Sequence, residues 1–95
     1  MTKIVWDENA VKITFVNEEL KKKIEDYIDK ANIKELMSLK EYEETGDERI
    51  IPVIDPSGGS YIKIVKHKGK LKLIAGVWEH GYAEEYFIGV LVIGK

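Results

Sequence analysis

The segment that decides the fold is YIKIVKHKGKLKLIAGVW, residues 61–78. Two strand-like runs flank Lys68-Gly69, and a two-residue connection ending in glycine is typical of a β-hairpin. This turn places His67 opposite Lys70 and sorts the side chains onto two faces. Because the register separates an apolar set from a basic one, we predict a hairpin here. The first face carries Ile62, Ile64, Leu71, Leu73 and Ala75, and the second carries Lys63, Val65, His67, Lys70, Lys72 and Ile74.

The last strand-like segment, residues 86–93, has no polar side chain on either face except the tyrosine hydroxyl. Strands of this composition are usually covered on both faces. A helix can cover one face, and the other needs either closure of the sheet or a second subunit. Because 95 residues leave little spare material, we favour a homodimer over a closed or strongly curled sheet. The predicted interface residues are Tyr86, Ile88, Val90 and Val92.

The N-terminal half mixes strand and helix patterns. Residues 4–6 and 11–16 predict a first hairpin, because apolar and polar residues alternate in the second run. Residues 20–31 predict an amphipathic helix, since apolar side chains recur at three- and four-residue steps after a capping Asn17. Residues 32–44 are ambiguous: we favour a short helix through about residue 39, followed by strand or loop.

The remaining elements complete a fold prediction. Residues 49–54 are rich in β-branched side chains, and Pro52 restricts them to an edge or bulged strand. A turn cluster follows at 55–60. We therefore predict a single α+β domain over residues 1–95. It consists of an N-terminal β-hairpin, one amphipathic helix with a second short one, and a mostly antiparallel meander that forms a curled sheet or small barrel.

Composition narrows the class of protein. The chain has no cysteine, which excludes a disulfide scaffold, a zinc ribbon and a thiol nucleophile. We expect a cytoplasmic protein with no membrane partner, because charge precedes any apolar run at the start and the charge-free stretch at 86–94 is too short to span a bilayer. Lysine and glutamate are abundant, glutamine is absent and isoleucine outnumbers leucine. This composition is typical of thermophiles and suggests an archaeon or a virus of one.

Charge is distributed unevenly along the chain. The net charge of −2 conceals −5 over residues 18–48 and +5 over residues 49–78. A lysine-bearing hairpin can lie against a phosphate backbone and bind nucleic acid without sequence specificity. A solvated hairpin whose lysines deter edge pairing is the alternative that we favour. In a third interpretation, the acidic segment of one subunit faces the basic hairpin of another. The candidate nucleic-acid contacts are Lys63, Lys66, His67, Lys68, Lys70 and Lys72.

Reactive side chains are sparse, and we predict no catalytic residue, cofactor or metal site. Residues 79–85 contain four potential metal ligands, which are Glu79, His80, Glu84 and Glu85. Their spacing matches no metal-binding loop. The glycines of 55–60 lack the following helix of a phosphate-binding loop. Aromatic residues, among them Trp6 and Trp78, could line a small-ligand pocket but are more often core. We therefore rank a binding domain that associates with itself or a protein partner first, polyanion binding second, a ligand pocket third and an enzyme last.

Overall fold

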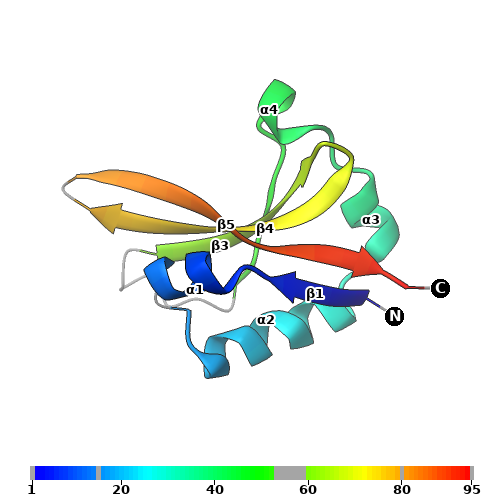
Figure 1. Cartoon of the computed structure of the whole chain (residues 1–95). Helices are drawn as coiled ribbons and strands as arrows, with labels where there is room; N and C mark the ends of the chain where they lie inside the picture. The colour runs from blue at the N-terminus through cyan, green and yellow to red at the C-terminus, as the bar shows by residue number, and fades with distance from the viewer. Residues whose placement is uncertain (1, 15, 53–59, 80, 95) are drawn as a thin grey trace.

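The computed structural model describes residues 2–14, 16–52, 60–79 and 81–94. Within these ranges the protein is an antiparallel sheet with strand order β1-β5-β4-β3-β2, accompanied by short helices (Figure 1). The elements in chain order are β1 (Thr2–Trp6), α1 (Glu8–Thr14), α2 (Glu18–Lys30), α3 (Ile33–Met37), α4 (Tyr42–Thr45), β2 (Arg49–Ile50), β3 (Ser60–His67), β4 (Lys70–Glu79) and β5 (Tyr82–Ile93).

The predicted central hairpin is confirmed with its register. β3 pairs with β4 so that His67 faces Lys70 and Ile64 faces Leu73. Lys68 and Gly69 both have positive φ, 54° and 76°, which is the backbone of a tight hairpin turn whose twist matches the strands. The apolar face of the hairpin is buried, and we call it the inner face of the sheet.

Helices α1 and α2 cover the inner face, below the sheet in Figure 1. The predicted amphipathic helix is confirmed as α2: Asn17 caps it by accepting a hydrogen bond from the Leu20 amide at 2.7 Å. Ile24 and Ile28 of α2 pack against the sheet, with exposed fractions of 2 % or less. The core that they form also contains Val11, Leu36, Ile62, Ile64, Leu71, Leu73, Ile88 and Leu91.

The predicted N-terminal hairpin is wrong, because residues 8–14 form helix α1 rather than a second strand. The reason is the cap: the Asp7 carboxylate accepts hydrogen bonds from the amides of Asn9 and Ala10 at 3.1 and 3.2 Å. The helix buries Ala10 and Val11 and leaves Ile13 53 % exposed, whereas the strand pattern required Val11 and Ile13 on one face. β1 pairs instead with the distant strand β5.

Between the helices and the hairpin, the short helix predicted after residue 32 is confirmed as α3. Within the segment predicted as strand or loop after it, Tyr42–Thr45 form a further helix, α4, and Gly46 caps this helix with a φ of 70°. The edge strand predicted over residues 49–54 is confirmed as β2 for Arg49–Ile50, and residues 53 and 54 lie outside the described residues. The sheet does not close into a barrel, because β1 and β2 remain its two edges among the described residues. The turn at 55–60 lies almost entirely outside the described residues.

β5 contains a bulge that decides which of its side chains face outward. Leu73 of β4 pairs with Gly89, but the next residue, Ile74, pairs with Phe87, so Ile88 is an extra residue on β5. A bulge of this kind reverses the alternation of side chains along one strand. Ile88 and Leu91 therefore face the core, whereas Phe87, Val90 and Val92 belong to the opposite, outer face of the sheet.

Candidate interaction surfaces on the outer face of the sheet

The hairpin lysines do not form one basic face. Lys66 lies opposite Leu71 on the inner side of the ribbon, and its ammonium donates a hydrogen bond to the Met37 carbonyl at 3.1 Å. Lys63 lies on the outer face but is only 4 % exposed. Each of these two ammonium groups has a partner within the chain that the sequence did not reveal, and their contact with nucleic acid stays a prediction.

Lys63 is held by acids and tyrosines from three segments. Its ammonium lies 2.6 Å from a Glu48 carboxylate oxygen and 2.8 Å from one of Glu85. It also donates to the Tyr42 hydroxyl at 2.8 Å and lies 4.7 Å from the centre of that ring. The Tyr61 hydroxyl donates to the same Glu85 carboxylate. These five side chains, which we call the Lys63 cluster, fasten α4 to the outer face of the sheet.

Ionisation states in the Lys63 cluster favour a structural role over catalysis. Burial alone would lower the pKa of Lys63, but hydrogen bonds to Glu48 and Glu85 outweigh it and raise the pKa. Burial and the hydrogen bond to Glu85 raise the pKa of Tyr61 to about 12. Burial opposes ionisation of Glu85 too, but Lys63 and Tyr61 lower its pKa. Near neutral pH, Lys63 is thus a fixed cation and Tyr61 a fixed phenol, and neither is poised as a base.

His67 and Lys72 are also engaged within the chain. The His67 Nε2 atom lies 2.7 Å from a Glu43 carboxylate oxygen on α4, and its Nδ1 atom lies 2.8 Å from the Lys72 ammonium. The His67 ring lies 4.9 Å from the ring of Phe87. α4 therefore contacts the basic hairpin at two places, through Tyr42 and through Glu43. The acidic segment predicted to face another subunit's hairpin packs on the hairpin of its own chain.

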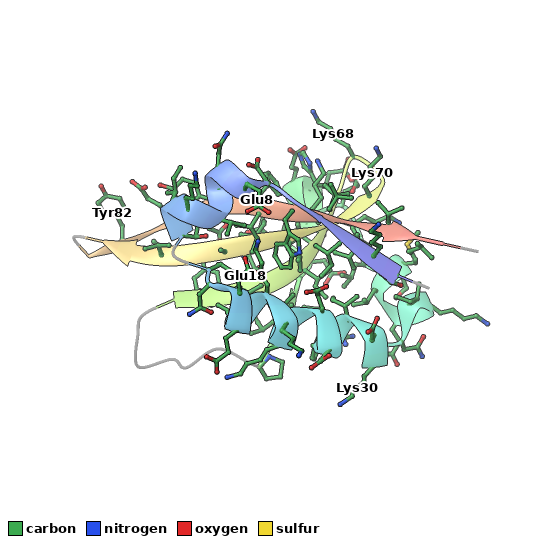
Figure 2. All side chains as sticks on the ribbon, turned by 60° about the horizontal axis from the view of Figure 1, so that its bottom comes forward. Glu8, Glu18, Lys30, Lys68, Lys70 and Tyr82 are labelled. Carbon is green, nitrogen blue, oxygen red and sulfur yellow. The ribbon has the colours of Figure 1, made fainter. Side chains whose placement is uncertain are left out.

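Lys68 and Lys70 are the cations that remain at the hairpin tip. Both are exposed, and neither forms a salt bridge with any residue that the structure describes. Figure 2 shows their side chains extending away from the body of the protein. The six-residue basic surface predicted from the sequence is thus reduced to this tip, with Lys72 at its base.

The predicted interface residues of β5 fall on two faces. Ile88 is fully buried and therefore offers no surface to a second subunit, whereas Tyr86 is partly buried against the core on the inner face. The prediction assumed regular alternation along β5, which the bulge at Ile88 breaks. Val90 and Val92 do lie on the outer face, where Val90 is half-buried and Val92 is 48 % exposed.

An apolar strip runs along the outer face of β1 and β5. Register places Val5 beside Val90, and Phe87 and Val92 lie on the same face. Val5 is 55 % exposed, and Phe87 is 43 % exposed. We call these four residues, Val5, Phe87, Val90 and Val92, the outer strip. The sequence did not predict Val5 and Phe87 as members of this strip. Their position depends on the pairing of β1 with β5 and on the bulge, and neither feature is visible in the sequence around these residues.

The other sequence-level candidates gain no support. His80 lies outside the described residues, and the described part of the chain contains no group of three or more potential metal ligands. Trp6 and Tyr27 pack against the core rather than lining a common pocket, and the side chain of Trp78 lies outside the description. No helix among the described residues is long and apolar enough to cross a membrane.

Comparison with known proteins adds no assignment. No family model matches the chain, and neither a curated protein nor a solved structure matches it.

Proposed function

We propose that the protein is a cytoplasmic, non-enzymatic binding domain that forms a homodimer through the outer strip. The observation that carries the proposal is exposure: Val5, Phe87 and Val92 are each more than two-fifths exposed on one continuous sheet face. Contiguous apolar patches on a small protein typically mark an interaction site. Two such faces pack well against each other, because apolar sheet faces stack about 10 Å apart with interleaved side chains.

Charge favours a second copy as the occupant. Lys3 is exposed at the edge beside the strip, and Glu44 is exposed on α4, with no salt bridge for either among the described residues. Consider a two-fold axis that runs along the strands above β5. It places α4 of one copy beside the β1 edge of the other, so that Glu44 approaches the partner's Lys3. A self-complementary surface of this kind is what a two-fold dimer requires.

The test is the solution mass of wild type and two matched variants. Val92→Asp introduces a charge into the outer strip, and Ile13→Asp introduces the same charge at a site of similar exposure on α1. We expect wild type and Ile13→Asp to have twice the monomer mass of 10.9 kDa by light scattering, and Val92→Asp to be a monomer. Equal masses for the two variants would overturn the proposal, provided that circular dichroism shows both folded.

A charge swap tests the two-fold arrangement itself. Lys3→Glu and Glu44→Lys should each weaken dimerisation, because each places like charges across the axis. The double variant restores opposite charges and should recover most of the lost affinity. Failure of the double variant to recover would reject this arrangement of the copies, whereas the Val92→Asp result stands independently.

Polyanion binding at the hairpin tip is a second candidate, supported by Lys68 and Lys70, which are exposed and form no salt bridge with the residues that the structure describes. With two or three lysines engaged, the logarithm of the affinity for duplex DNA should fall with the logarithm of salt at a slope of about −2. Lys68→Glu with Lys70→Glu should abolish binding, while Lys22→Glu with Lys23→Glu on α2 serves as the control. Absence of binding at low salt would remove this candidate.

The composition supports an origin in a thermophilic archaeon or a virus of one. Calorimetry should then give a Tm well above the range of about 45–65 °C that is typical of mesophile domains. A Tm inside that range would contradict the inference.

A further inference from the structure

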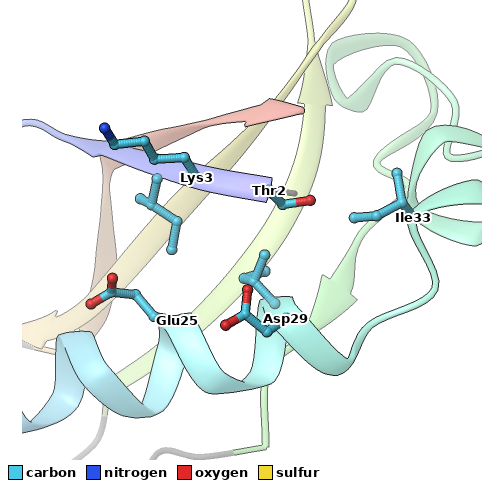
Figure 3. A pocket seen from close by; sticks show the side chains of 7 residues that line it. Thr2, Lys3, Glu25, Asp29 and Ile33 are labelled. Atoms are coloured by element: carbon cyan, nitrogen blue, oxygen red, sulfur yellow. The ribbon is translucent and has the colours of Figure 1, made fainter. Parts of the chain in front are cut away.

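A groove separates the free edge of β1 from helix α2. Its volume is about 790 Å³, and the end of α2 and the start of α3 close one side of it (Figure 3). Thr2 and Ile4 contribute from β1, whereas Glu25, Ile28 and Asp29 contribute from α2. This groove is separate from the outer strip, because it opens beside the inner face and the sheet edge.

The backbone of β1 offers hydrogen bonds to this groove. β1 is an edge strand whose described partner is β5. The Asp7 amide donates to the Ile88 carbonyl at 2.9 Å, so residue 7 directs its polar backbone groups towards β5. In an antiparallel pair, alternate residues point to the same neighbour. Thr2, Ile4 and Trp6 therefore direct their amides and carbonyls to the open edge, where an added strand can pair with them.

The floor and rim of the groove differ in polarity. Ile28 is 2 % exposed at the floor, and Ile4 and Ile33 are partly buried against the core. Glu25 and Asp29 are exposed and lie one helical turn apart, so they share one face of α2. Figure 3 shows both carboxylates directed towards β1.

These carboxylates lack, as Asp26 does, the salt-bridge partners that the first-turn acids of α2 have among the described residues. Glu18 and Glu19 form salt bridges with Lys21 and Lys23, but no salt bridge within the described ranges involves Glu25 or Asp29. Lys3 also borders the groove, but it alternates with Ile4 and so belongs to the outer face of β1. A cation from a ligand can therefore bind between Glu25 and Asp29.

We propose that this groove binds an extended peptide segment of a partner protein, which adds to β1 as a strand and places a lysine or arginine against Glu25 and Asp29. Strand addition obtains affinity from backbone hydrogen bonds and specificity from pockets for alternate side chains. A second copy of this chain fits less well. Pairing β1 with its own copy brings the same two acids of both α2 helices to one groove, where like charges repel.

The test uses two synthetic peptides in which valine and threonine alternate around one lysine. The lysine stands at an odd position in one peptide and at an even position in the other, so that it faces α2 in one of them. Titration into ¹⁵N-labelled full-length protein should shift the amides of Thr2, Ile4 and Trp6. Replacing the peptide lysine by glutamate should abolish these shifts. A peptide with methylated backbone nitrogens keeps the side chains but cannot donate backbone hydrogen bonds, and it should also fail to bind.

Matched variants separate this recognition from general charge effects. Glu25→Gln with Asp29→Asn should weaken the lysine peptide about tenfold, because two charged contacts are lost. Asp26→Asn removes a neighbouring exposed charge of α2 and should leave the affinity unchanged. Equal effects of the two changes, or no shift in β1 with either lysine peptide, would overturn the proposal. Concentration-dependent shifts of Thr2, Ile4 and Trp6 without peptide in Val92→Asp, in which the outer-strip dimer is broken, would overturn it in favour of self-pairing of β1.

Discussion

The outer face of the sheet has a covered half and a bare half that differ sharply in exposure. Over β3 and β4, Val65 is fully buried and Ile74 is 2 % exposed. Over β5 and β1, on the same face, Val92 is 48 % exposed and Val5 is 55 % exposed. Figure 1 shows the cause: α4 lies above the hairpin half, and the described chain places no helix above the rest.

The difference teaches how a small chain covers a sheet with little apolar material. α4 has only four residues and none of them is buried, so apolar packing of the helix cannot hold it in place. The Lys63 cluster and the contact of Glu43 with His67 hold it instead. The covered half thus depends on charge within the chain, and the bare half leaves the apolar surface that we propose a second copy covers.

The largest expected effect is removal of the Lys63 cation. Lys63→Met keeps the length of the side chain but leaves the carboxylates of Glu48 and Glu85 facing each other without a cation. Breaking a buried ion pair costs about 3–5 kcal/mol, and because each carboxylate is about one-third exposed we expect the lower end, about 3 kcal/mol. Urea unfolding measures this loss. Lys70→Met, at an exposed site, should change the free energy of unfolding by less than about 0.5 kcal/mol; equal losses would contradict the role of the Lys63 cluster.

Two glycines compare the covered half of the outer face with the inner face of the sheet. A Cβ atom at Gly76 would lie 2.1 Å from the ring of Tyr61, so Gly76→Ala must displace a member of the Lys63 cluster. At Gly89, which pairs with Leu73 and so belongs to the inner face, the nearest atom would be a methyl carbon of Ile4 at 3.0 Å. We expect losses of about 2 kcal/mol for Gly76→Ala and about 1 kcal/mol for Gly89→Ala in urea unfolding. The reverse order would show that Tyr61 does not constrain the covered half.

The loss of stability at acidic pH should depend on Glu85. Although burial opposes its ionisation, Lys63 and Tyr61 hold its pKa below the ordinary value of 4.5 in the folded protein. The stability that it contributes is therefore present above pH 4.5 and is lost as the pH falls through the folded pKa. We expect urea unfolding to show that, between about pH 7 and about pH 3, the free energy of unfolding falls less for Glu85→Gln than for wild type. Parallel profiles would exclude Glu85 as a source of acid sensitivity.

The sequence predicted the elements whose signals are local. The Lys68-Gly69 turn and the alternation of apolar and basic side chains predicted the register of β3 with β4. The capping residue Asn17 and apolar side chains at three- and four-residue steps predicted α2. The N-terminal hairpin failed, because a short alternating run is compatible with a helix once Asp7 caps it. The outer strip was only half predicted, since it depends on one extra residue in β5 and on a pairing between opposite ends of the chain.

The contacts that the hairpin lysines make within the chain were missed for a different reason. Spacing placed Lys63 correctly on the face opposite Ile64, but it gave no sign that Glu48 and Glu85 converge on the ammonium. These contacts join residues far apart in sequence, which a pattern along one strand cannot reveal. An exposed lysine and a buried, paired one have the same sequence signature.

The smallest expected effect is on the stability of the bare half itself. Because Val92 is already about half exposed, Val92→Asp should change the free energy of unfolding of the monomer by less than about 0.5 kcal/mol. Dimerisation stabilises the folded state by mass action, so the Tm of wild type should rise with protein concentration. The Tm of Val92→Asp should not. A concentration-independent Tm for wild type would contradict dimerisation in the tested range.

Sedimentation equilibrium of the wild-type protein at micromolar concentration tests the assignment of the bare half most directly. We expect a species of twice the monomer mass of 10.9 kDa that dissociates when Val92 is replaced by aspartate. A wild-type protein that remains a monomer over the whole accessible concentration range would contradict it.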